Sequence, residues 1–390
     1  MMRLLFKNAV VFAMTFVALN VQAGDKYKSK SSHKEEAQEP KWKTENILTH
    51  SWAGKKINAA VWGIAAGDVD GDGSNEIVLL ERNAVRVGKI NGDEFKINAS
   101  YEWKGFIAGV RIFTMNLDND PAEEIVVSAV EDGRPASFAL KWSNDEFHPM
   151  FWNEPWHIRV VENLPNNGGK ILAGQQWASS SFFTGAIFKL SFDGGKLTRG
   201  DRITLPKRTE IFNFAILPAG AEEQTLTAQD PPFINYRVFR LAGFEHLVLF
   251  EPKGKKFKKV WASGERYGGS LNIIEAVERE VMNTATDQVT IDREPQFVKA
   301  GEGSYVYAIR HDIPLKGMIG RRPDIRSGTI VALREDLSFG FMKCFETEEV
   351  PGFISDFIIE PKRLIASVQL NPSMFYESRQ STLLIFELPE

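Results

Sequence analysis

Short apolar segments separated by turn residues recur along most of the chain. Residues 76–80, 84–90 and 94–103 are three such segments, and Asn91-Gly92-Asp93 between the last two is a tight-turn signal. Apolar and polar residues tend to alternate in these segments with a period of two, which is typical of strands with one buried face. Because a helical period is nearly absent, the pattern predicts an all-β chain built from antiparallel hairpins.

The strand pattern repeats at intervals of about 48 residues over its first three copies. The repeats start near the following residues: 68, 116, 163, 216, 277 and 359. The last interval is long enough to hold one more copy. Four short strands per repeat is the signature of a propeller blade, and stacking such blades around an axis covers the faces that a single blade leaves exposed. We therefore expect a β-propeller of six or seven four-stranded blades.

The last repeat lacks a fourth strand. It contains three strand patterns, at 353–359, 364–368 and 381–388, whereas the N-terminal stretch 41–53 resembles the fourth strands of the other repeats. An unpaired edge strand is a liability for aggregation. We therefore expect residues 41–53 to close the ring, so that the propeller covers residues 41–390.

The N-terminal residues predict export. Residues 1–23 combine the basic Arg3 and Lys7, an apolar run at 9–19 and a small-x-small cleavage signal, as in a secretory signal peptide; an uncleaved membrane anchor is the alternative. Residues 24–40 are Lys, Ser and Glu with almost nothing apolar, which predicts a disordered tether. We expect a periplasmic or secreted protein without a membrane span after cleavage.

Composition narrows the class of protein further. The chain has 390 residues, a hydrophobic content of 43% and a net charge of −4 with both signs interspersed, so nothing in its overall charge indicates nucleic acid binding. Its one cysteine, Cys344, cannot form an internal disulfide and stands in an apolar run. We expect this thiol to be a buried apolar group rather than a nucleophile.

An acidic loop carries the clearest chemistry. Residues 68–76 read Asp-Val-Asp-Gly-Asp-Gly-Ser-Asn-Glu. The alternate positions of Asp68, Asp70 and Asp72 let their carboxylates converge, and Glu76 can close the shell. Hard oxygen ligands in this number suit Ca²⁺, and a strand pattern follows where an EF-hand would continue into a helix. We expect a calcium loop; a solvated acidic turn is the alternative.

The loop recurs in weaker forms. Residues 116–124 keep oxygen ligands at the same four positions: Asn116, Asp118, Asp120 and Glu124. Pro121 replaces the second glycine, so this copy is either a second calcium site or a turn without metal. A third copy at 163–169 has no carboxylate and is interpreted as a relic of the turn.

Residues 62–80 and, more loosely, 110–127 resemble the FG-GAP or VCBS repeat family of integrin-type β-propellers. The family pattern is a short apolar strand, then Asp-x-Asp-x-Asp-Gly-x-x-Asp, then a second apolar strand. The match covers the blades expected at 62–103 and 109–151, and residues 157–390 would form degenerate blades.

This resemblance implies a seven-bladed propeller with Ca²⁺ on one side, and a role as an extracellular binding or structural module, with enzymes a minority. It also implies these ligands: the side chains of Asp68, Asp70, Asp72 and Glu76, a main-chain oxygen of Ser74, and the weaker counterparts Asn116, Asp118, Asp120 and Glu124.

Three other stretches are candidate binding surfaces: an aromatic one with Trp152 and Trp156, a lysine-rich hairpin tip at 253–259, and a basic loop with Arg321, Arg322 and Arg326. For the tryptophans the alternative is packing between blades, and for the lysines a solvated turn. The sequence contains none of the common motifs for acyl transfer, zinc proteolysis, phosphate binding or haem attachment.

We therefore expect an exported, calcium-stabilised propeller that binds or scaffolds a protein or glycan of the cell envelope or extracellular space. The alternative is an exported propeller enzyme, a hydrolase or lyase acting on a polysaccharide, with acidic residues in the central channel. A channel lined by several Asp, Glu or His would favour the enzyme. A channel plugged by apolar side chains, with an aromatic or basic rim, would favour the binding module.

Overall fold

The computed structural model describes the following residues: 47–165, 169–178, 181–218, 234–241, 245–275, 288–300, 303–314, 323–336, 340–372 and 378–389. These residues belong to one compact unit, which spans 44–390. The predicted signal peptide and tether lie outside the described residues, as do Arg321 and Arg322. Every regular element within the described ranges is a β-strand.

The first three blades follow one another along the chain. Blade 1 contains β3 (Gly63–Gly67), β4 (Glu76–Leu80), β5 (Ala84–Asn91) and β6 (Glu94–Glu102). Blade 2 contains β7 (Ala108–Met115), β8 (Glu124–Glu131), β10 (Ser137–Ser143) and β11 (Glu146–Glu154), with the short β9 (Arg134–Pro135) paired to β8. Blade 3 contains β12 (His157–Leu164), β13 (Gly169–Ala178), β14 (Ser181–Asp193) and β15 (Lys196–Arg202).

The remaining blades are less regular. Blade 4 contains β16 (Phe214–Pro218), β17 (Tyr236–Arg240), β18 (Glu245–Lys253) and β19 (Lys256–Tyr267). A two-stranded sheet of β20 (Ile273–Glu275) and β21 (Gln288–Thr290) follows. Blade 5 contains β22 (Gln296–Ala300), β23 (Gly303–Asp312), β24 (Ser327–Asp336) and β25 (Gly340–Thr347), with β26 (Val350–Pro351) paired to β24. Blade 6 contains β27 (Phe353–Glu360), β28 (Arg363–Gln369), β29 (Ser381–Glu387) and β2 (His50–Ala53).

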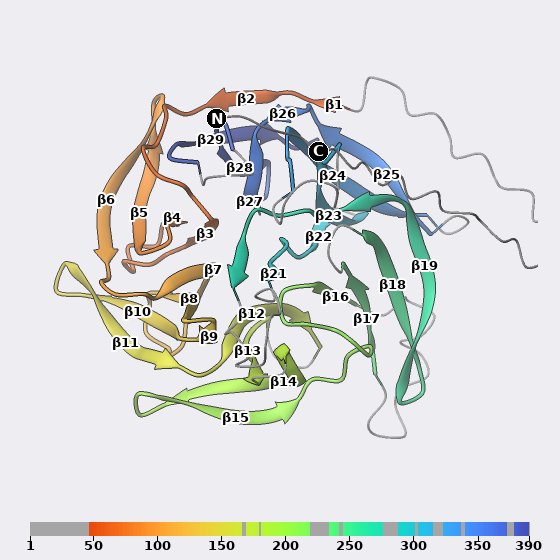
Figure 1. Ribbon diagram of the computed structural model, residues 1–390, viewed down its shortest axis with the longest axis horizontal. Helices are drawn as coiled ribbons and strands as arrows, with labels where there is room; N and C mark the ends of the chain where they lie inside the picture. The colour runs from red at the N-terminus through yellow and green to blue at the C-terminus, as the bar shows by residue number, and fades with distance from the viewer. Residues whose placement is uncertain are drawn as a thin grey trace, which may run out of the picture. The chain divides into compact units, whose positions relative to one another are not determined.

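The predicted propeller is therefore confirmed, and its ring has six blades (Figure 1). The described strands do not form the seventh blade that the family resemblance implies. Blade 5 begins at β22, later than the start near residue 277 that the repeat pattern indicates; residue 277 itself lies outside the described residues. The two strands β20 and β21 lie between blades 4 and 5 instead.

The N-terminal strand closes the ring, as the sequence predicts. Strand β2 pairs antiparallel with β29, where Ala53 lies opposite Leu384. The preceding strand, β1 (Ile47–Leu48), pairs parallel with β25 of blade 5. The backbone N–H of His50 also donates to Glu348 Oε1 at 2.8 Å. The N-terminal segment thus covers the outer edges of two neighbouring blades, which leaves fewer unpaired strand edges.

Aromatic side chains fill the spaces between blades. Phe239 of blade 4 and Phe341 of blade 5 meet edge to face with their ring centroids 4.7 Å apart. Trp103 of blade 1 meets Phe138 of blade 2 in the same way at 5.0 Å. Trp156 is buried in a cluster between blades 2 and 3. These contacts explain why short sheets with so many aromatic residues stack into a ring.

Candidate functional site

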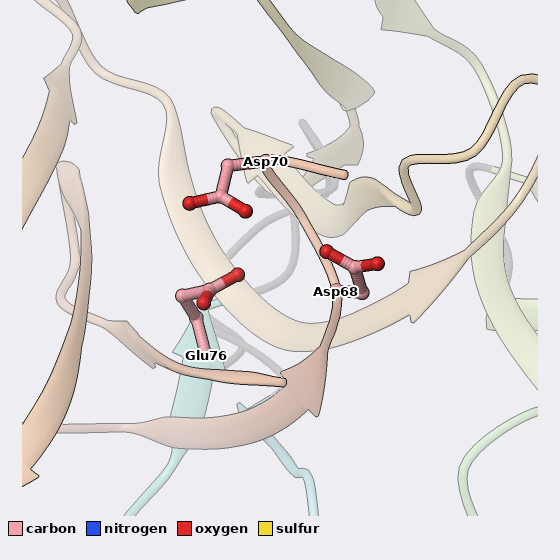
Figure 2. Close-up of side chains that lie close together, drawn as sticks. All are labelled: Asp68, Asp70 and Glu76. Carbon is pink, nitrogen blue, oxygen red and sulfur yellow. The ribbon is translucent and has the colours of Figure 1, made fainter. Parts of the chain in front are cut away.

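Three carboxylates of the first acidic loop converge. One oxygen atom from each of Asp68, Asp70 and Glu76 lies within 4.8 Å of the other two. Figure 2 shows the three side chains around a shared space. The loop connects the inner strand β3 to β4, and Glu76 is the first residue of β4, with a residue exposure of only 2%.

The loop backbone holds these carboxylates in place. Gly71 and Gly73 have φ of 77° and 87°, the left-handed region that glycine adopts without strain. The N–H of Gly73 donates to Asp68 Oδ2 at 2.9 Å, and that of Val69 donates to Glu76 Oε2 at 3.1 Å. The other oxygen of Asp68, Oδ1, is buried and has no hydrogen-bond partner. A buried carboxylate oxygen without a donor fits a site for a cation, since unpaired burial of such an atom is costly.

Asp72 lies apart from this convergent group. Its Oδ1 accepts a hydrogen bond from the backbone N–H of Ser74 at 2.8 Å, and its Oδ2 lies 3.3 Å from Lys89 Nζ. Lys89 Nζ also lies 2.8 Å from Glu76 Oε1. The ammonium group therefore neutralises part of the charge of the loop, and the contact with Glu76, followed by that with Asp72, raises the pKa of Lys89. The loop sequence contains no signal for this lysine, because it comes from strand β5.

The second acidic loop also brings three carboxylates together, but from its third, fifth and ninth positions instead of its first, third and ninth. Asp118, Asp120 and Glu124 converge within 4.8 Å. Glu124 is fully buried; its Oε2 accepts from the N–H of Leu117 at 2.6 Å, and its Oε1 is buried with no hydrogen-bond partner. Burial, together with the charges of the nearby aspartates, raises the pKa of Glu124 to about 7 against the opposing effect of the hydrogen bond from Leu117. Lys141 Nζ contacts Asp118 and lies 2.5 Å from Asp120 Oδ2, so a lysine neutralises part of the charge of this loop as well.

Asn116 supports the backbone of the second loop. Its Oδ1 accepts from the N–H of Asn119 at 2.6 Å, and its side-chain amide donates to the carbonyl of Asp120. Asn119 has a φ of 66°. Asparagine tolerates this left-handed conformation better than most residues, so the loop turns without the glycines of the first copy. Asn116 is not among the side chains that converge.

The acidic loops contact each other. The carbonyl oxygen of Asp68 accepts a hydrogen bond from the N–H of Glu123 at 2.7 Å. Glu123 Oε1 in turn lies 2.9 Å from the Nζ of Lys170 in blade 3. A Cβ on Gly67 would lie 2.1 Å from Glu123 Oε2 and 2.8 Å from Thr114 Cβ, so a larger residue here would have to displace these side chains. The two loops are therefore joined by a direct backbone hydrogen bond.

A network of five charged side chains occupies the axis of the ring. It consists of Arg111, Arg159, Arg293, Glu294 and Asp356, each with a side-chain exposure of 8% or less. Arg111 Nη2 lies 2.8 Å from Glu294 Oε2, and its Nη1 lies 3.1 Å from Asp356 Oδ2. Arg293 contacts the same two carboxylates.

This network links all six blades. Arg111 is on β7, Arg159 on β12 and Asp356 on β27, and Arg293 and Glu294 come just before β22. The N–H of Ile64 on β3 donates to Asp356 Oδ2 at 3.0 Å. Arg159 Nη1 donates to the carbonyl of Phe214 on β16 at 2.7 Å. The network therefore contacts every inner strand or the segment next to it.

The channel carboxylates are engaged as ion-pair partners. Burial alone would raise the pKa of Glu294, but the charges of Arg111, Arg293 and Arg159 hold it well below its ordinary value. Glu294 therefore stays ionised near neutral pH and cannot donate a proton there. The channel does contain acids, as the enzyme alternative expects, yet Glu294 and Asp356 are held by guanidinium groups.

A cluster of apolar side chains lies beside the starts of two inner strands. Trp62, Leu271, Ile325 and Phe353 form a buried cluster there, and the guanidinium of Arg82 stacks on the Trp62 ring at 3.7 Å from its centroid. Trp62 and Phe353 stand at the start of the inner strands β3 and β27, whereas the acidic loops follow the ends of inner strands. The acidic loops and the apolar cluster therefore mark opposite ends of the channel.

The other predicted binding residues are dispersed. Trp156 is buried between blades, whereas Trp152 has an exposure of 37% and stacks on Phe138 with centroids 4.3 Å apart. The Arg326 side chain is exposed and lies 3.8 Å from Asp324. These residues form no common surface with the acidic loops. Burial raises the pKa of Cys344 to about 11, so its thiol is a poor nucleophile.

No protein-family model matches the chain, and no curated protein sequence matches it. Solved structures align with it at low similarity. A protein from Lactobacillus plantarum has 8% identity and a TM-score of 0.38, with 80% of this chain and 78% of that chain covered.

Two further structures carry provisional enzyme names. One is an oxidoreductase (glucose dehydrogenase) from Thermus thermophilus, with 10% identity, a TM-score of 0.40 and coverage of 86% and 98%. The other is a 6-phosphogluconolactonase from Bacteroides fragilis, with 11% identity, a TM-score of 0.36 and coverage of 75% and 74%. At these TM-scores the likenesses carry no argument about function. Among the described residues, no helix is long and apolar enough to cross a membrane.

Proposed function

We propose that this chain is an exported β-propeller whose acidic loops bind Ca²⁺ and whose loop-bearing face binds or scaffolds a protein or glycan outside the cytoplasm. The observation that carries the proposal is the pair of acidic loops. Each brings three carboxylates within 4.8 Å of one another, and each contains a buried carboxylate oxygen that has no hydrogen-bond donor.

Several features favour Ca²⁺ over other cations. The convergent side chains offer only oxygen atoms, which suit hard cations, and neither cluster contains a histidine or cysteine. The resemblance of residues 62–80 to FG-GAP repeats supports the same ion. The predicted signal peptide agrees, because exported calcium loops work at the high calcium levels found outside the cytoplasm.

Calcium would act on stability and on the shape of the loop face. Binding relieves repulsion among the carboxylates, and it stabilises the folded chain by about 1.4 kcal/mol when calcium is at ten times its dissociation constant. Because the Asp68 carbonyl accepts from the N–H of Glu123, occupation of one loop also fixes its neighbour. A partner that contacts both loops would therefore bind more tightly in calcium.

The metal is tested by thermal unfolding of the chain from Gly24 onward, in about 5 mM calcium or in EDTA, since exported sites work near 10⁻⁴–10⁻³ M. We expect calcium to raise the Tm, and Asp70→Asn to reduce this rise. The matched control is Asp145→Asn at the exposed hairpin tip of blade 2, which should leave the rise unchanged. Equal melting curves in calcium and EDTA would sink the calcium assignment.

The binding role is tested by capture from envelope extract with the tagged chain as bait. We expect a partner that is retained in calcium, released by EDTA and lost with Asp70→Asn. The enzyme alternative is less well supported, because the axial carboxylates Glu294 and Asp356 are paired with arginines. A partner retained equally by the native chain and by Asp70→Asn would show that the loop face is not the docking surface.

A further inference from the structure

A cavity lies on the ring axis. Its volume is about 300 Å³, and residues from the inner strands of all six blades line it, which places it at the lower end of the range for small-molecule pockets. Glu162, Asn163 and Asn75 belong to its lining and are exposed, so the cavity reaches solvent on the side of the acidic loops. The lining between combines polar groups with aliphatic side chains, among them Ile112 and Ile216.

The buried part of the lining carries a surplus of positive charge. Arg159, Arg293 and Glu294 line the cavity, and the network to which they belong contains three guanidinium groups but only two carboxylates. A buried charge without a close partner is costly. Both carboxylates lie in close contact with Arg111 and Arg293, which leaves Arg159 as the least neutralised member.

The contacts of Arg159 agree with this assignment. The residue has an exposure of 7%. Its Nη1 donates to the carbonyls of Ile211 and Phe214 at 3.1 and 2.7 Å. Its Nε, like those of Arg111 and Arg293, has no hydrogen-bond partner. Arg159 differs from these two arginines in the distance to its carboxylate, since Glu294 Oε1 is 3.6 Å from its Nε. Burial lowers the pKa of Arg159 to about 10, against the opposing effect of Glu294.

We propose that this cavity binds a small organic monocarboxylate, with its carboxylate against Arg159 and its aliphatic body against the isoleucines of the lining. A planar carboxylate matches the edge of a guanidinium group and adds the negative charge that the network lacks. The aliphatic part of the lining favours an organic acid over an inorganic anion. Glu162 and Glu294 also line the cavity, and their charges disfavour a ligand with two negative charges.

This site differs from the calcium loops and does not depend on them. Its ligand would lie between the acidic loops and the axial network. It would contact several blades at once, so its binding should stabilise the ring by mass action.

The test is calorimetric titration of the chain from Gly24 onward with hexanoate, hexanamide and inorganic phosphate at constant ionic strength. We expect hexanoate to bind, and hexanamide and phosphate to bind at least tenfold more weakly, since a hydrogen bond to a charged group contributes roughly 1.5–3 kcal/mol. Arg159→Gln should weaken hexanoate binding by about tenfold or more. Equal binding of hexanoate and hexanamide, or phosphate binding as tight as hexanoate, would overturn the proposal.

Arg159→Gln also removes contacts that hold blade 4, so this variant could fail to fold. Glu162→Gln gives a second test, because Glu162 is exposed and its charge acts on Arg159 from outside the buried network. We expect Glu162→Gln to tighten hexanoate binding without changing the binding of hexanamide. If no carboxylate binds either the native chain or Glu162→Gln, the cavity is not an organic-anion site.

Discussion

Replacement of Glu294 by glutamine tests whether the axial network holds the ring together. The side chain of Glu294 has an exposure of 3% and pairs with Arg111 at 2.8 Å, with Arg293 in close contact and with Arg159 at 3.6 Å. Glutamine has nearly the same volume but no charge. The substitution leaves three buried guanidinium groups with one carboxylate, so its effect is electrostatic rather than steric.

The substitution should lower the free energy of unfolding by a large amount. Breaking a buried ion pair by removing one partner costs about 3–5 kcal/mol, and we expect the upper end because Glu294 serves three arginines. The whole free energy of unfolding of a domain is about 5–15 kcal/mol. The matched control is Glu102→Gln, which removes the partner of Arg86 at 2.6 Å where the Glu102 side chain is 61% exposed. That substitution should cost about 0–1 kcal/mol.

Urea unfolding followed by tryptophan fluorescence measures both losses, provided that the slope of the transition is unchanged. If Glu294→Gln costs no more than Glu102→Gln, the network does not stabilise the ring and the reasoning is refuted.

Three further outcomes are expected. Lys89→Met should tighten calcium binding by about tenfold in a calorimetric titration, because the Lys89 ammonium group competes with calcium for the Glu76 carboxylate. Unchanged or weaker calcium binding would contradict this. Burial lowers the pKa of His157 to about 3 and that of His311 to about 4, whereas both histidines titrate near 6.5 in the unfolded chain. The free energy of unfolding should therefore fall as the pH drops below about 6.5, by about 1.4 kcal/mol per pH unit and per histidine. If the double variant H157Q/H311Q shows the same dependence of stability on pH, the two histidines are not its cause. A chain that begins at Gly54 lacks β1 and β2, so its circular dichroism should show a lower Tm; full stability would refute ring closure by these strands.

The repeating hairpins and the closing strand were predictable because they depend on local alternation and turn residues. The blade count was harder to predict. Blade 5 has no acidic loop to mark its start, and an irregular stretch that contains β20 and β21 precedes it. The sequence therefore left six and seven blades open.

For the acidic loops, too, the local sequence predicts only part of the structure. The alternation of aspartates correctly predicts that Asp68 and Asp70 approach Glu76. It also predicts Asp72 in the same group, but Lys89 from another strand contacts Asp72 instead. Spacing along a loop cannot reveal a partner that only the fold of the blade brings near.

Local sequence patterns could not predict the axial network. Arg111 and Asp356 are 245 residues apart and meet only because the ring closes. Each did carry a signal, since it is a charged residue flanked by mostly apolar residues in the middle of an inner strand. A charge at such a position predicts a buried partner, although not which one.

The most direct test of the central claim is a crystal structure of the chain from Gly24 onward grown with calcium, with anomalous scattering to identify the ion. We expect a calcium ion bound by Asp68, Asp70 and Glu76, on the face of the ring where the inner strands end. Carboxylates held only by Lys89 and water, with no ion at calcium concentrations that saturate exported loops, would contradict the account.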